Sequence, residues 1–247
     1  MLTVGNWKAY VETPEEAKKL VATAKRMALR TRTKIVLAPP APLLALIAGG
    51  KRSKIAFAGQ DVSDTLAGAS TGEVSAPALK AAGASYVIIG HSERRARGET
   101  DALIAEKAKR AVANGLIPIL CVGENERDTD ARYLSVIRSQ LAAVFDALLP
   151  RDRLSVIVAY EPVWAIGKRS DEAIRSTDLA EMVLYIRKVL ADYLPGKDAS
   201  KAKVIYGGSV DSTNARELAG GSGVDGFLPG RASTDTSTLS ALIKAVS

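Results

Sequence analysis

The sequence of 247 residues contains one histidine, His91, and one cysteine, Cys121. A single imidazole excludes a metal site built on several histidines, and we expect neither a metal nor a cofactor. A single thiol excludes an internal disulfide and fits a reducing compartment such as the cytoplasm. Cys121 falls in the apolar run "IPILCV", so we expect it to be buried and structural.

Aromatic residues and long apolar runs are also scarce. Phe, Trp and Tyr make up 5% of the chain, and no basic stretch alternates with them as a base-stacking platform would require. No run of about 18 apolar residues occurs, so no membrane span is predicted. The opening "MLTVGNWKAY" lacks the basic and apolar segments of a secretory signal. We therefore expect neither nucleic acid nor a membrane as a partner.

The chain carries a formal charge of +7 and has a pI of about 9.5. Its basic residues are interleaved with acidic ones, as in "PEEAKK" and "DALIAEKAKR", a pattern typical of solvated helix faces. Since the interleaving disfavours nucleic acid, the excess positive charge is better explained by attraction of a small anion.

Short apolar runs alternate with helix-like stretches along the whole chain. The runs predict strands that begin at Leu2, Lys34, Ile55, Tyr86, Leu116, Leu154, Lys203 and Val224. Such spacing is typical of a βα unit repeated eight times. Runs such as "KIVLA" and "LSVIVAY" are almost continuously apolar, as expected when helices cover both sides of a parallel strand.

The helix-like stretches show the longer period. Residues 130–149 place one apolar stripe at Tyr133, Leu134, Ile137, Leu141, Val144, Phe145 and Leu148. Residues 177–194 place another at Leu179, Met182, Val183, Ile186, Val189 and Leu190. Thr13 followed by Pro14, Glu15 and Glu16 is typical of a helix start. We predict that both stripes contact the core.

Eight parallel βα units form either a closed barrel or an open doubly wound sheet. No Gly-x-Gly-x-x-Gly pattern follows an early strand, which weakens the dinucleotide-binding version of the open sheet. The repeat number and the chain length favour an α/β fold, a (βα)8 TIM barrel, as a single domain over residues 1–247. In such a barrel the functional groups gather at the carboxyl ends of the strands.

Polar or glycine-rich groups follow five of the predicted strands. They are Asn6 and Lys8 in "GNWK", His91 and Glu93 in "GHSE", Glu161 in "AYEPVWAIG", Gly207, Gly208 and Ser209 in "YGGSV", and Gly230 in "LPGR". Glycine turns expose N–H groups that cradle a phosphate, and a lysine adds a point charge for a dianion. A carboxylate removes a proton next to a carbonyl, and a neutral imidazole polarises that carbonyl.

The motifs "GNWK", "GHSERR", "CVGE", "AYEPVWAIG" and "YGGSV" occur in this order at suitable intervals. With them the chain resembles the triosephosphate isomerase family from end to end. The resemblance implies interconversion of dihydroxyacetone phosphate and D-glyceraldehyde 3-phosphate through an enediolate, as a step of glycolysis and gluconeogenesis. It also implies that Glu161 is the base and that His91, as a neutral ring, polarises the carbonyl.

The resemblance extends to the rest of the site. It implies that Lys8 neutralises substrate charge, that Asn6 donates to a substrate oxygen and that Glu93 holds Lys8. The implied phosphate-binding residues are Asn6, Lys8, Gly167, Ser209, Gly230 and Arg231. The implied lid starts with Pro162, Val163, Trp164, Ala165, Ile166, Gly167 and Lys168, followed by Arg169. On closure, Ile166 and Leu228 would press on the Glu161 carboxylate and disfavour its charged form.

Residues 60–76, "QDVSDTLAGASTGEVSA", form a long stretch rich in small residues. Loops of this length are uncommon unless they are functional. In the family the corresponding loop enters a pocket of a second subunit, and Thr71 matches the threonine near its tip. We therefore predict a homodimer; the alternative is a loose loop on a monomer.

The chain departs from the family pattern at two places. After the last strand it has Pro229-Gly230-Arg231 where two glycines are usual, and a side chain at Arg231 would be strained if that position required a positive φ. The hinge "KRSDEAIRSTDL", residues 168–179, is about two residues longer than usual for such a lid. A related branch that isomerises tetrulose phosphates can also carry arginine at the position of Arg231. Two alternatives therefore stay open, a tetrulose-phosphate isomerase and a non-catalytic barrel that binds phosphate ligands.

Overall fold

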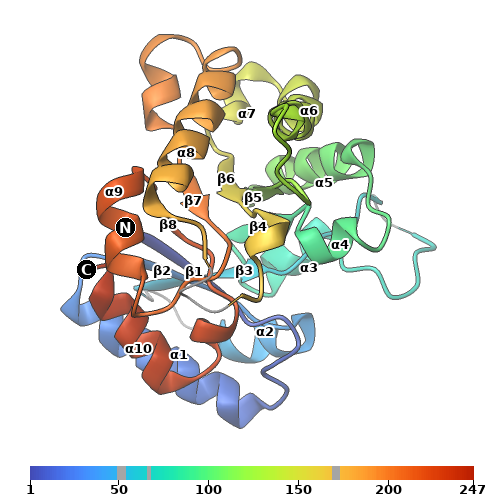
Figure 1. Ribbon diagram of the computed structural model, residues 1–247. Coiled ribbons are helices and arrows are strands. Elements are labelled where there is room, and N and C mark those ends of the chain that lie inside the picture. Colours follow the sequence, from blue (N-terminus) through green and yellow to red (C-terminus); the bar gives the residue numbers. More distant parts are fainter. Residues whose placement is uncertain (49–53, 66–67, 169–172) are drawn as a thin grey trace.

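The computed structural model describes residues 1–48, 54–65, 68–168 and 173–247. Its parallel strands pair in sequence order, and β1 also pairs with β8, so the sheet is a closed barrel (Figure 1). The strands are β1 (Leu2–Asn6), β2 (Lys34–Ala38), β3 (Ile55–Gly59), β4 (Tyr86–Ile89), β5 (Ile117–Val122), β6 (Ile157–Tyr160), β7 (Val204–Tyr206) and β8 (Gly226–Phe227). The predicted TIM barrel is confirmed.

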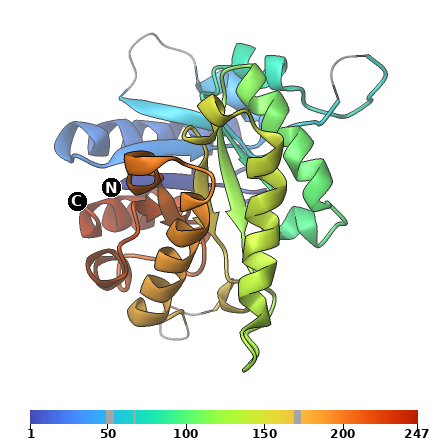
Figure 2. The same ribbon diagram turned by 90° about the horizontal axis from the view of Figure 1, so that it is seen from above.

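Helices surround the barrel (Figure 2). The α-helices are α1 (Pro14–Arg30), α2 (Ala41–Ile47), α3 (Ala76–Ala81), α4 (Ser92–Arg95), α5 (Asp101–Ala113), α6 (Arg132–Ala147), α7 (Pro150–Arg153), α8 (Ser176–Ala191), α9 (Ala215–Ser222) and α10 (Thr236–Ala245). Short 3-10 turns add η1 (Val163–Ala165), η3 (Gly196–Lys201) and η4 (Arg231–Ser233). No helix among the described residues is long and apolar enough to cross a membrane.

The strand starts predicted from the sequence match the first half of the barrel and run slightly early in the second half. Strands β1 to β4 begin where predicted, whereas β5, β6, β7 and β8 begin one to three residues later. The reason is that the residues before these strands still belong to turns. Leu116, for example, donates its N–H to the carbonyl of Ala111 at the end of α5, and Leu154 caps the short helix α7.

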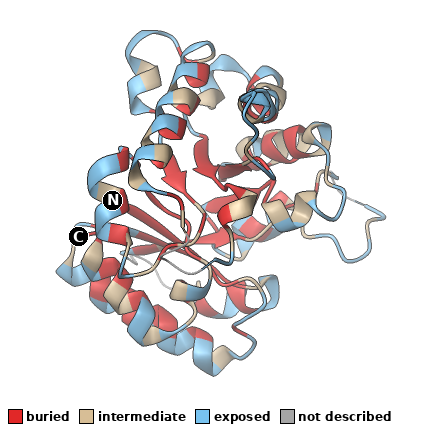
Figure 3. Cartoon of the chain, viewed as in Figure 1, coloured by how far each residue is buried: buried red, intermediate tan, exposed pale blue. Residues whose placement is uncertain are grey.

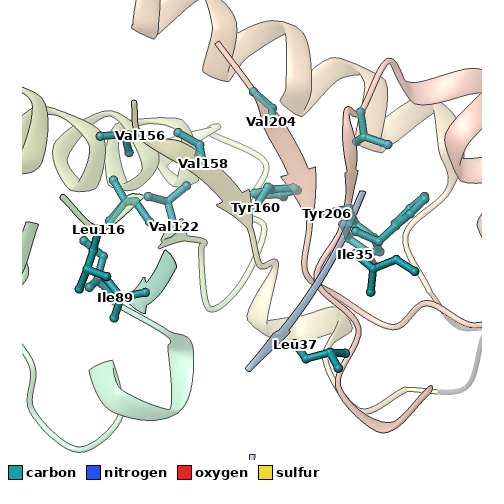
Figure 4. Packing of buried hydrophobic residues seen from close by; sticks show 14 of the residues in the cluster. Ile35, Leu37, Ile89, Leu116, Val122, Val156, Val158, Tyr160, Val204 and Tyr206 are labelled. Carbon is teal, nitrogen blue, oxygen red and sulfur yellow. The ribbon is translucent and has the colours of Figure 1, made fainter. Parts of the chain in front are cut away.

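The core consists of two layers, because the residues of each strand face alternately inward and outward. In β4, Tyr86 and Ile88 belong to the cluster inside the barrel, whereas Val87 and Ile89 belong to the cluster shared with the helices. Both faces of the strands are buried, while the helices expose their outer faces (Figure 3). Figure 4 shows part of the outer layer. This packing explains the continuous apolar runs in the sequence.

The helix predictions agree with the structure in most details. Thr13 caps α1 by accepting from the N–H of Glu16, whose carboxylate accepts in turn from the N–H of Thr13. All six stripe residues predicted for α8 are buried. In α6, Tyr133 and Leu134 are only half-buried, because they lie in the first turn, at the end of the helix.

Candidate active site

Glu161 and His91 lie side by side at the carboxyl ends of β6 and β4. His91 Nε2 is 3.3 Å from Glu161 Oε1, and the side chains are only 8% and 2% exposed. The other carboxylate oxygen of Glu161, Oε2, accepts from the backbone N–H of Ser92 at 3.1 Å. The glutamate N–H donates to the carbonyl of Val122, which ties this strand end to β5. A carboxylate and an imidazole therefore meet in a setting largely shielded from water.

His91 is the N-cap residue of α4, and this position defines which ring nitrogen carries the proton. Its Nδ1 accepts from the backbone N–H of Glu93 at 3.2 Å. A nitrogen that accepts a hydrogen bond carries no proton, so the ring is neutral and its proton is on Nε2. Nε2 lies 3.3 Å from Glu161 Oε1, so it is the ring nitrogen nearest the carboxylate.

Lys8 reaches the same site from a strained backbone at the end of β1. Its φ is +47°, in the left-handed region, which costs of order 1–3 kcal/mol for a residue with a side chain. The Lys8 N–H donates to Asn6 Oδ1 at 3.1 Å, and Gln60 Nε2 donates to the Lys8 carbonyl at 2.8 Å. These bonds hold the unusual conformation and direct the ammonium group towards α4.

The Lys8 ammonium pairs with Glu93, at 2.7 Å between Nζ and Oε1. Burial raises the pKa of the Glu93 carboxyl, but the hydrogen bond and the charge of Lys8 lower it more, so the net pKa lies below the ordinary value. Glu93 therefore stays ionised at neutral pH and can hold the ammonium in place.

The groups predicted at separate strand ends converge on one cavity of about 680 Å³. Its lining includes Asn6, Lys8, His91, Glu93, Glu161, Ile166, Gly167, Lys168, Gly207, Gly208, Ser209, Leu228, Gly230 and Arg231. Within the described ranges, the N–H groups of Gly167 and Gly230 have no hydrogen-bond acceptor. They are donors available to an anion. A smaller cavity of about 490 Å³ lies against Glu161, but neither His91 nor Lys8 lines it.

Other predicted residues lie beside this cavity or outside the described residues. Pro162–Ala165 do not line it, and the Val163 N–H donates instead to the carbonyl of Glu124. Arg169 and residues 170–172 of the hinge are outside the described ranges, as are residues 66–67 of the loop around Thr71. In the part of the chain that is described, no group of three or more His, Cys, Asp or Glu residues is arranged to hold a metal ion.

Gly207 shows how tightly the Glu161 side chain is packed. A Cβ added there would lie 2.7 Å from Glu161 Cγ and 3.2 Å from its Oε1. Distances below 3.0 Å essentially never occur for a real Cβ, so only glycine allows this approach. The glycine of the "YGGSV" motif therefore has a steric role in addition to the phosphate-cradling role predicted from the sequence.

The departures after β8 cause less strain than the sequence suggests. Arg231 does not have a positive φ; it begins the η4 turn, and its exposed side chain lines the cavity. No ion pair involves it within the described residues. Pro229 has no N–H, but its carbonyl accepts from the N–H of Asn6 and connects β8 to β1. The backbone strain that a positive φ would cause at Arg231 is therefore absent.

Two contributions were missed from the sequence. The Ser92 N–H, which holds Glu161, is a backbone group and leaves no signal in the residue type. Glu124, at the end of "CVGE", is 1% exposed and accepts from Tyr160 Oη at 2.7 Å and Trp164 Nε1 at 2.9 Å. An acidic residue just after a buried strand was the available signal.

Cys121 is buried as predicted. This burial, followed by the charge of Glu161, raises the pKa of its thiol well above the ordinary value.

Together, the barrel, the carboxylate beside a neutral imidazole, the lysine and the free N–H groups define an aldose–ketose isomerase of the (βα)8 class. A family model described as triosephosphate isomerase matches residues 1–246. The chain belongs to the triosephosphate isomerase family.

Similar proteins cover almost the whole chain. A triosephosphate isomerase of Coprinopsis cinerea is 39% identical over 93% of this chain and 91% of its own length. The one from Moorella thermoacetica is 38% identical over 98% of this chain and 97% of its own. The one from Deinococcus radiodurans is 44% identical over 92% of this chain and 91% of its own.

Proposed function

We propose that this barrel interconverts dihydroxyacetone phosphate and D-glyceraldehyde 3-phosphate, with Glu161 as the base and His91 as the electrophile. The observation that carries the proposal is the contact of 3.3 Å between the Glu161 carboxylate and the neutral ring of His91. A base and a proton donor at this separation can act on adjacent carbon and oxygen atoms of one small substrate.

In the proposed reaction, Glu161 takes a proton from the carbon next to the substrate carbonyl. The electron pair of that C–H bond forms the new carbon–carbon double bond, and negative charge develops on the carbonyl oxygen. The Nε2–H of His91 donates to this oxygen, and Lys8 and Asn6 stabilise the charge. A proton then moves between the two oxygens through His91, and Glu161 returns its proton to the neighbouring carbon.

The proposed phosphate site is the far side of the same cavity. The N–H groups of Gly167 and Gly230, which have no acceptor among the described residues, support it, and Ser209 also lines the cavity. Lys8 and Arg231 add positive charge to that lining. Neutral backbone donors with nearby cations are a common arrangement for binding a phosphate dianion.

Residues 162–168 are proposed to close over the bound substrate. In the structure, Gly167 is exposed, and the Glu161 carboxylate accepts a hydrogen bond from the Ser92 N–H. Catalysis therefore requires the carboxylate to turn from Ser92 towards the substrate. Closure would bring Ile166 and Leu228 against it and exclude water, which suppresses loss of phosphate from the enediolate.

Replacement of Glu161 by glutamine tests the proposal, because the amide keeps the size of the side chain but is not a base. We expect kcat in a coupled isomerase assay to fall by about a thousandfold or more. Binding of 2-phosphoglycolate, measured by calorimetry, should persist because the phosphate contacts remain. A variant with wild-type kcat would disprove the assignment of the base.

Arg231 supports a second candidate, a tetrulose-phosphate isomerase, because its exposed guanidinium lines the substrate cavity and forms no ion pair with another described residue. An added cation there could bind a hydroxyl or phosphate of a longer substrate. Measuring kcat/KM for triose and tetrulose phosphates on one preparation separates the two reactions. Binding of 2-phosphoglycolate without turnover of either substrate would instead indicate a non-catalytic phosphate-binding barrel.

A homodimer is proposed to form through the loop of residues 60–76. The described part of this loop, residues 60–65 and 68–76, projects from the barrel in both views (Figures 1 and 2), and Thr71 is exposed on it. The Ser63 N–H donates to the Val74 carbonyl at 2.9 Å and closes the base of the loop. A closed base with an exposed tip supports insertion into a second subunit. A cytoplasmic location stays a prediction, which cell fractionation would test.

A further inference from the structure

The guanidinium group of Arg127 lies over two aromatic rings, one of them in the proposed lid. Its central carbon is 5.2 Å from the ring centroid of Tyr133 on α6 and 5.2 Å from that of Trp164 in η1. These distances are within the range of cation–π attraction. Arg127 therefore connects a helix of the barrel wall to the first residues of the proposed lid.

The same guanidinium also contacts the polar groups beneath the rings. Arg127 Nη2 donates to Tyr160 Oη at 3.2 Å, and its Nε donates to Glu124 Oε1 at 3.3 Å. Burial lowers the pKa of Arg127, but these hydrogen bonds and charges raise it more, so it stays positively charged. Arg127 is thus fixed to β6 and to the end of β5 independently of Trp164.

Glu124 depends on this charge. A buried carboxylate is costly unless it is paired, and within the described ranges Arg127 is the cation that forms an ion pair with Glu124. Glu124 Oε1 also accepts the indole N–H of Trp164, while its Oε2 has no hydrogen-bond partner. Arg127 therefore stabilises the position of Trp164 in two ways. Its guanidinium makes a cation–π contact with the indole ring, and its charge stabilises the Glu124 carboxylate that accepts the indole N–H.

We propose that Arg127 is a positioning residue that stabilises the position of residues 162–168 seen in this structure, through its contacts with Trp164. The proposal deepens the proposed function, since it treats residues 162–168 as a lid that closes on substrate. Arg127 does not line the substrate cavity, so we expect it to influence the reaction only through the lid. When Trp164 moves with the closing lid, the ring contact and the bond to Glu124 break.

The variant Arg127→Met removes the charge and keeps a flexible apolar stem. Loss of one cation–π contact should raise the population of the closed lid by about two- to fivefold. The chain has two tryptophans, so a ¹H–¹⁵N spectrum gives separate indole signals for Trp164 and Trp7. In the ligand-free protein we expect the Trp164 signal to shift towards its position with 2-phosphoglycolate, and the Trp7 signal to stay unchanged.

Ligand binding gives a second readout, because a lid that closes more easily binds its ligand more tightly. We expect the Kd of 2-phosphoglycolate to fall by about two- to fivefold in Arg127→Met. A merely structural loss would weaken binding instead. The matched control is Arg138→Met on α6, where the exposed Arg138 pairs with Asp192 at 3.1 Å; it should leave both readouts unchanged.

The variant Arg127→Lys keeps the test valid if the methionine variant fails to fold. Lysine supplies charge to Glu124 but cannot stack as a planar group, so we expect an intermediate shift of the Trp164 signal. Identical Trp164 signals in wild type and in each variant that folds, Arg127→Lys alone included, would overturn the proposal. The ligand-free spectrum does not depend on turnover, so an inactive wild type would refute the proposed function without affecting this result.

Discussion

Replacement of Gly207 by alanine tests whether the position of Glu161 is set by the space left for it. The added Cβ would lie 2.7 Å from Glu161 Cγ, about 0.7 Å short of the 3.4 Å at which ordinary contact begins. The atoms that the Cβ would meet belong to the Glu161 side chain, which one hydrogen bond from the Ser92 N–H anchors, and not to a backbone. We therefore expect the glutamate, rather than the backbone of β7, to move.

A displacement of this size has a predictable cost in rate. A shift of about 1 Å in a reacting group lowers the rate by about a hundredfold, so we expect kcat of Gly207→Ala to fall by about ten- to a hundredfold. Overpacking of a filled site costs typically about 1–3 kcal/mol, so the free energy of unfolding should also decrease. Substrate binding should change less than kcat, because the proposed phosphate donors at Gly167 and Gly230 are untouched.

The assay is steady-state turnover in both directions, combined with urea unfolding of the same preparations. The matched control is Gly220→Ala in α9, where an added Cβ meets no atom within 4 Å. That variant should retain full activity and gain about 0.5–1 kcal/mol of stability, because alanine is the better helix former. A Gly207→Ala enzyme with kcat within twofold of wild type would refute the steric argument.

Three further variants test the cavity, the backbone of β1 and the projecting loop. Arg231→Gly should raise KM by about fivefold with little change in kcat, because an exposed charge is lost; an unchanged KM would show that the arginine points away from the substrate. Gln60→Ala removes hydrogen bonds to the carbonyls of Lys8 and Ala38, so the free energy of unfolding measured in urea should fall by about 1–2 kcal/mol. An unchanged free energy of unfolding would show that other contacts hold the strained Lys8 backbone. Thr71→Arg should give a monomer mass in light scattering, whereas a retained dimer would exclude this loop from the interface.

The fold was predictable because strands and helices of this chain have different patterns of apolar residues, and each pattern indicates how the element is buried. Apolar runs such as "KIVLA" mark strands covered on both faces, and stripes such as the one in α8 mark helices covered on one face. The strand starts were less accurate where a helix ends just before the strand. An apolar residue at such a place can either end the helix or begin the strand. Leu154, predicted to begin a strand, is instead the C-cap of α7.

The site was predictable to the extent that it depends on side-chain type at strand ends. Parallel strands bring Glu161 and His91 to one rim, so naming them needed only the strand order. The positive φ of Lys8 was not predictable, because Gln60, which helps to hold it, is remote in sequence. Nor was the link between Arg127 and Glu124, since three donors share one buried oxygen only in the folded chain.

The pairing of β1 with β8 bears on how the chain is made. A ribosome releases β1 first and β8 last, and until β8 emerges the first strand has one unpaired edge. Such an edge can pair with a strand of another nascent chain. Synthesis that stalls before residue 226 would therefore leave a nearly complete but open sheet, a species that should need a chaperone more than the finished protein does.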